Sequence, residues 1–439
     1  MDTTASDFLG YEARALSRRL AQVQPFALTE VMVPAASIPR RAHWMIERHM
    51  DAGRRELHLR IRSYLGWLAS TQGRFATATE GQRRFVQLRL RFNRVLTQFD
   101  LFADALSQRS ERENGVWLAG LDAIAADALA LPRFFDSPPV LCYLDRGAGA
   151  AIRRARTRLP GGGSNPVAII RVPRERMVGN GIASSLVHEV GHQAAALLGL
   201  VPSLRLAIRQ RREQTAGLSG LAWHCFERWI SEIVADFWSV ARVGVVSTLG
   251  LFGVVSLPSA FVFRIQLDEP HPFPWIRVLL SCAIGRALYP DPQWDRLAAL
   301  WQGFYPITAL DGDRRALLRT LEANLPDFVD LLLNHRPPSL AQASLAEVMD
   351  IHRRRPQRLR TEYLGWRGAP GAIYRLPPTI ALAAIGQQRA DGAITAERES
   401  QTVARLLTHW ALRGALQLPQ QPRRLGPSTR PRNLQPAAT

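Results

Sequence analysis

The chain has 439 residues, of which 47% are hydrophobic and 21% are charged. These values are ordinary for a globular protein, and the length exceeds what one small core can organise. The formal net charge is +19, and arginine carries the whole excess because the sequence contains no lysine. This charge favours anionic partners in general, but the sequence has no compact basic cluster and no specific nucleic-acid motif.

Three widely spaced cysteines, Cys142, Cys225 and Cys282, form no CxxC pair. This pattern argues against a disulfide framework and against a thiolate zinc site. The N-terminal segment is polar and carries no secretory signal. Together these features predict a cytoplasmic protein.

Residues 1–135 are predicted to form an N-terminal helical region. Arg40–Leu68 and Gln82–Ser107 mix apolar residues and arginines at helical spacing. A basic tract such as Arg83–Phe92 fits either a nucleic-acid-binding helix or the solvated face of a helical bundle, and the second is the more common case. We expect this region to be a platform or a partner-binding module.

Residues 136–335 are predicted to form the core of the protein. Val140–Leu144 is short and apolar, and Pro166–Pro173 is β-branched and bounded by prolines, so both are expected to be strands. An exposed edge strand beside a metal site pairs readily with an extended peptide. A small sheet packed on a helix is the plain structural alternative, and the two are compatible.

A helix is predicted around His188-Glu189-Val190-Gly191-His192, which lies in a proline-free run of helix-forming residues. Positions i and i+4 share one helical face, so His188 and His192 can offer two imidazoles to one cation. Glu189 lies one step around the helix, within reach of a water molecule at that cation. This is the HExxH pattern of zinc hydrolases. The alternative is a buried helix with two hydrogen-bonded histidines.

Glu232 and Asp236 repeat the i, i+4 spacing within an apolar helical segment, Trp229–Trp238. Carboxylates among apolar neighbours are costly unless they are paired or bind a metal. Glu232 is therefore predicted to be the third zinc ligand, and Asp236 to orient a ligand histidine through a hydrogen bond. A surface acidic pair, or an N-cap, is the alternative.

With these residues in place, the sequence resembles the gluzincin metallopeptidases, in particular the branch of the CAAX prenyl endopeptidases and HtpX-type proteases. That branch pairs HExxH with a later ExxAD, here Glu232–Asp236, and with an HPxxxxR-like element, here His271–Arg277. The resemblance spans about residues 138–290. It implies that His271 stabilises the developing oxyanion and that Arg277 braces the site. Those relatives carry membrane helices before or between the motifs, which this chain lacks there.

The longest uncharged stretch is Val243–Phe263, with 21 residues. Its glycines, Pro258 and hydroxyl residues favour a buried hairpin over a membrane span, so membrane association is possible but not favoured. Residues 336–417 are predicted to be a C-terminal helical region, and residues 418–439 a disordered basic tail.

The sequence thus predicts a mainly α fold with a small β-sheet, an α+β zincin-like metallopeptidase core flanked by helical regions. The expected function is that of a zinc (Zn2+)-dependent endopeptidase acting on a protein or peptide substrate. The alternative is a catalytically inactive or structural-zinc helical interaction protein, associated with a membrane surface or with nucleic acid.

Overall fold

A computed structural model of the chain describes residues 1–146, 149–159, 163–177, 179 and 181–417. It is mainly α-helical with one three-stranded sheet among these residues, which confirms the prediction of a mainly α fold with a small β-sheet. The predicted tail, 418–439, lies outside the described residues. The predicted boundaries at 135 and 335 stay predictions.

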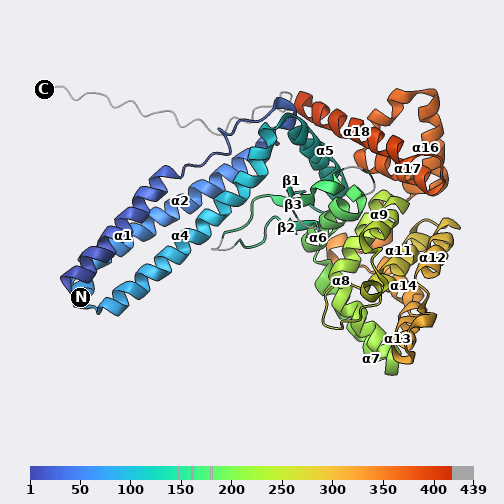
Figure 1. The fold of residues 1–439 in the computed structure, drawn as a ribbon, viewed down its shortest axis with the longest axis horizontal. Coiled ribbons are helices and arrows are strands. Elements are labelled where there is room, and N and C mark those ends of the chain that lie inside the picture. The colour runs from blue at the N-terminus through green and yellow to red at the C-terminus, as the bar shows by residue number, and fades with distance from the viewer. Residues whose placement is uncertain (147–148, 160–162, 178, 180, 418–439) are drawn as a thin grey trace.

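Helices α1 (Thr3–Gln22), α2 (Arg40–Ala69) and α4 (Ala78–Ser107) form a long arm that projects from the rest of the molecule (Figure 1). Their buried residues recur every three or four positions, so each helix turns one apolar stripe toward the other two. The arginines of the same helices lie mainly on the outer faces. The arm thus follows the bundle interpretation of its basic tracts.

The sheet has the strand order β1-β3-β2 and joins the arm to the body. β1 (Val140–Asp145) and β3 (Ala168–Pro173) correspond to the two predicted strands and pair in parallel. β2 (Ala151–Arg153) pairs antiparallel with β3 and forms an edge of the sheet. Side chains alternate across a strand. Leu141 and Ile169 accordingly join the core of the arm, while Cys142 and Ile170 join the core of the body.

The body is built around α8 (Gly217–Val243), which is buried along most of its second half. α6 (His188–Leu197), α9 (Val245–Val255) and α11 (Pro274–Leu288) pack against it. α5 (Arg112–Leu129) packs against α6 and accepts a hydrogen bond from Trp238 of α8 at the carbonyl oxygen of Ala128. The other helices of this part are α7 (Leu200–Glu213), α10 (Ser259–Val262), α12 (Gln293–Phe304), α13 (Gly312–Ala323), α14 (Leu325–Asn334) and α15 (Leu345–Val348).

The C-terminal helices α16 (Pro356–Gly368), α17 (Pro378–Ala390) and α18 (Ala396–Gln417) cover one end of the body, and α18 reaches back to the base of the arm, where it packs against the turn Pro34–Ala36 (Figure 1). α18 packs along α5, and α17 packs against α8 and α9. Their buried side chains belong to the same hydrophobic cluster as the residues of α8. The C-terminal region therefore shares its core with the body.

The uncharged stretch 243–263 forms α9, a turn and the short α10. The first half of α9 is buried, whereas residues 256–261 are exposed, so the stretch is a helix with an exposed turn and only partly the buried hairpin expected. Among the described residues, no helix has both the length and the apolar content that crossing a bilayer requires.

Candidate metal centre

The HExxH residues begin helix α6, and a π-helical turn (η4, Ala183–Val187) precedes them directly. The predicted helix is therefore present. The imidazole rings of His188 and His192 lie edge to face with their centroids 4.9 Å apart. Because the two residues are one turn apart, both rings point to the same side of α6, where α8 runs.

α8 approaches α6 unusually closely at Gly191, the fourth residue of the motif. A Cβ at this position would lie 2.7 Å from Cα of Ala235 and 2.9 Å from its carbonyl oxygen. Only glycine allows this backbone contact. The contact brings the carboxylates of α8 within reach of the histidines of α6.

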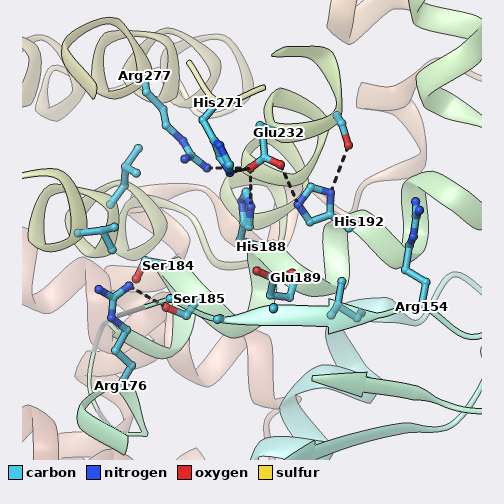
Figure 2. A pocket seen from close by; sticks show the side chains of 17 residues that line it. Arg154, Arg176, Ser184, Ser185, His188, Glu189, His192, Glu232, His271 and Arg277 are labelled. Carbon is cyan, nitrogen blue, oxygen red and sulfur yellow. Dashed lines mark hydrogen bonds and ion pairs between the residues drawn. The ribbon is translucent and has the colours of Figure 1, made fainter. Parts of the chain in front are cut away.

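His188, His192 and Glu232 form the cluster that results (Figure 2). Nε2 of His188 lies 3.2 Å from Oε2 of Glu232, and Nε2 of His192 lies 3.4 Å from Oε1. One donor atom of each residue lies within 4.8 Å of the other two, so the cluster could hold a metal ion. The structure thus brings together the three residues predicted as ligands.

Asp236 connects this cluster to Arg277 of α11. Nδ1 of His188 donates a hydrogen bond to Oδ1 of Asp236 at 2.8 Å. Arg277 donates from Nε to Oδ2 at 2.7 Å and from Nη2 to Oδ1 at 2.9 Å. Its guanidinium also lies 3.6 Å from Oε2 of Glu232. All these groups are largely buried, and each charged group contacts a group of opposite charge. This pairing offsets the cost of removing the charges from water.

The charges around the cluster give its two histidines very different pKa values. Burial alone lowers the pKa of His188, but the carboxylates of Asp236 and Glu232 outweigh it and raise that pKa to about 9. Burial and the charge of His188 lower the pKa of His192 to about 4. Burial raises the pKa of Glu232, yet His188, His192 and Arg277 together lower it to about 2. Without a metal, His188 is therefore the protonated, cationic histidine at neutral pH, and His192 is neutral.

Glu189 lies between the two histidines and the strand that borders the cleft (Figure 2). Its carboxylate forms no hydrogen bond or ion pair with any residue that the structure describes. Burial raises its pKa above the ordinary glutamate value, and the nearby Glu232 adds to this rise. A carboxylate with a raised pKa and no partner is suited to accept a proton.

His271 belongs to the loop before α11 and reaches the same site from the other side. Its Nε2 lies 3.5 Å from Oε2 of Glu232, and its Nδ1 lies 3.1 Å from Oε1 of Glu269. Its side chain is 51% exposed, far more than the other histidines of the site. His271 thus lines the cleft next to the cluster, where a ligand can reach it.

The cluster opens into a cleft with a volume of about 470 Å³. Several residues that line the cleft were not predicted from the sequence: Ile152 of β2, Arg154, Arg176, Ser185, and Leu251 and Val254 of α9. Ser231 was also missed, and its Oγ lies 3.5 Å from Nδ1 of His192, at the limit of a hydrogen bond. Only Ser231 had a visible signal, since it directly precedes Glu232.

Comparison with models of protein families, with curated proteins and with solved structures finds no match for this chain. The site must therefore be interpreted from its own geometry.

Proposed function

We propose that the chain is a zinc-dependent endopeptidase of the gluzincin type. The observation that carries this proposal is the meeting of His188, His192 and Glu232 with Glu189 in one open cleft. A structural zinc site normally uses four protein ligands, whereas a catalytic one uses three and leaves a position open. Three donors at the bottom of an accessible cleft match the second kind.

The donor set suits zinc. Two imidazoles and one carboxylate are the ligands of the His2Glu class, and tetrahedral zinc at about 2.0–2.1 Å from its ligands places them roughly 3.3 Å apart. The separations of 3.2 and 3.4 Å between Glu232 and the two histidines agree with this value. When bound, zinc lowers the pKa of a water molecule and polarises the substrate carbonyl.

The chain supplies the proton transfers and the charge stabilisation. Glu189 accepts a proton from the attacking water and returns it to the amide nitrogen as the carbon–nitrogen bond breaks. His271 donates a hydrogen bond to the carbonyl oxygen as negative charge develops there. Asp236 accepts a hydrogen bond from Nδ1 of His188 and so leaves Nε2, beside Glu232, free to bind a metal, while Arg277 holds Asp236 in place.

The substrate we propose is a protein or peptide in extended conformation. β2 is the edge strand of the sheet, and Ala151 and Ile152 line the cleft beside the cluster. The free edge of such a strand can pair with a peptide backbone and hold it over the site. The cytoplasm is the proposed location, because all three cysteines are buried and unbridged.

The test is metal content by elemental analysis, combined with hydrolysis of a mixed peptide library. We expect about one zinc per chain in the wild type and in Glu189→Gln, and little in Glu232→Ala. Only the wild type should hydrolyse peptides. Zinc binding without hydrolysis of any peptide would favour the alternative, a helical interaction protein with a structural zinc. A wild type that cannot be loaded with zinc would contradict the whole assignment.

A further inference from the structure

The charged side chains of the cleft divide into two groups. Among the described residues that line it, the only carboxylates are Glu189 and Glu232, which the proposed chemistry occupies. Of the arginines, Arg277 is held by two hydrogen bonds to Asp236. Arg154 and Arg176 remain as charges that the metal chemistry does not use.

Arg154 directly follows β2 and lies on the His192 side of the cleft (Figure 2). Its side chain is exposed and forms no ion pair with any described residue. The preceding residue, Arg153, is also exposed and unpaired within the described part of the chain, but it does not line the cleft. An unpaired guanidinium at the rim of a cleft is available to a ligand.

Arg176 lies on the opposite side of the cluster, next to Ser184 and Ser185 (Figure 2). Its Nη1 donates a hydrogen bond to Oγ of Ser185 at 3.2 Å, which fixes the guanidinium toward the cleft. Its Nε contacts Oε1 of Glu175 at 3.0 Å, but Glu175 is mostly exposed and water screens the pair. The guanidinium of Arg176 is therefore only weakly neutralised by Glu175 and can still attract an anionic ligand.

We propose that the cleft selects peptides with acidic side chains on both sides of the cleaved bond, and that Arg154 is the main determinant. This inference rests on the proposed function. β2 has only three residues, so backbone pairing with it supplies few hydrogen bonds and side-chain contacts must supply much of the selectivity. Guanidinium groups bind carboxylates with two parallel hydrogen bonds, which favours Asp and Glu over neutral residues.

The first experiment compares kcat/KM for three sets of fluorogenic peptides, with acidic, neutral or basic residues around one cleavable bond. We expect the acidic set to be preferred over the neutral one about fivefold, the effect of one exposed ion pair of about 1 kcal/mol. Arg154→Glu should abolish or reverse this preference. Arg153→Glu makes the same change in charge one residue away, outside the cleft, and should leave the preference unchanged.

A binding experiment separates this inference from the proposed function. Fluorescence anisotropy on zinc-loaded Glu189→Gln should show tighter binding of the acidic peptide, weakened by salt and by Arg154→Glu but not by Arg153→Glu. Absence of hydrolysis with every peptide set would count against the peptidase, while this binding preference would still support an acidic ligand.

Three results would overturn the inference. The first is equal kcat/KM, or equal binding, for the acidic and neutral sets. The second is an equal loss of preference in Arg153→Glu and Arg154→Glu, which would indicate the general field of the chain. The third is a DNA duplex that binds through Arg154 and displaces the acidic peptide, while cleavage shows no preference for acidic substrates. That combination would indicate that nucleic acid is the ligand of Arg154.

Discussion

Gly191 of α6 and Ala235 of α8 face each other through their backbones, with no side chain between them. Gly191 is the fourth residue of the HExxH motif and Ala235 is the fourth of ExxAD. The two motifs are thus joined at positions that bind no metal, and this contact sets the distance from the histidines to Glu232.

Gly191→Ala tests this contact. The new methyl group would overlap the backbone of Ala235, so we expect a loss of about 1–3 kcal/mol in the free energy of unfolding and weaker zinc binding. Chemical denaturation of the metal-free protein and a zinc titration measure the two effects. Gly253→Ala on the exposed face of α9 meets no atom within 4 Å and serves as the control. Unchanged stability and zinc affinity in Gly191→Ala would contradict the prediction.

Zinc binding should release a proton from His188. The pKa of His188 is raised to about 9, so the metal-free protein holds this proton at pH 7 and loses it as the pH rises through 9. Because zinc needs the neutral imidazole, we expect His188 to release about one proton per zinc at pH 7, about half a proton at pH 9, and fewer still at higher pH. Calorimetry in buffers of different ionisation enthalpy measures this number.

Asp236→Asn provides the comparison for the proton count. Loss of the carboxylate removes the main interaction that raises the pKa of His188. The variant should therefore bind zinc with a smaller proton release at pH 7. A release that is the same in the variant and the wild type would show that the proton comes from another group.

Arg277 is expected to act as a positioning residue through Asp236. Arg277→Met removes the guanidinium that pairs with the buried carboxylate of Asp236 and leaves His188 as its only cationic partner among the described residues, which should lower the free energy of unfolding by about 3 kcal/mol. Zinc affinity should also fall about tenfold, because His188 is then held less firmly. The double variant with Asp236→Asn should regain part of the stability but not the zinc affinity. Additive losses in stability would contradict this coupling.

His271→Gln should separate catalysis from metal binding. His271 lines the cleft but is not among the three residues of the metal cluster, so zinc content should stay at the wild-type level. Loss of a hydrogen bond to the oxyanion should lower kcat about a hundredfold with little change in KM. His224→Gln, on α8 and outside the cleft, is the matched control. An unchanged kcat would remove His271 from the mechanism.

Local patterns in the sequence predicted much of this fold. Apolar residues at helical spacing predicted α2 and α4 to within a few residues, and β-branched or apolar runs predicted β1 and β3. The i, i+4 spacing placed His188 above His192 on one face of a helix. These features depend only on neighbours within about two turns of the chain, which is why a pattern contains them.

Features set by distant contacts were not predictable in this way. β2 has only three residues in an arginine-rich segment and shows no strand pattern of its own, because pairing with β3 creates it. Arg154 and Arg176 reach the cleft only through that folding. Glu232 lies 44 positions after His188. Its place beside the histidines is predicted from the cost of a carboxylate among apolar neighbours and from the three ligands that a catalytic zinc uses, not from a spacing between the two motifs.

The sheet belongs to two cores at once, and this limits how the protein can be shortened. Removing the arm would leave Leu141, Val167 and Ile169 facing water, although all three are fully or almost fully buried in the intact chain. Exposing each costs roughly 1.5–3 kcal/mol, enough to loosen β3 and with it the edge strand beside the metal centre. The arm thus covers the second face of the sheet, and a fragment that begins after the arm would lack the packing that supports β3 and β2.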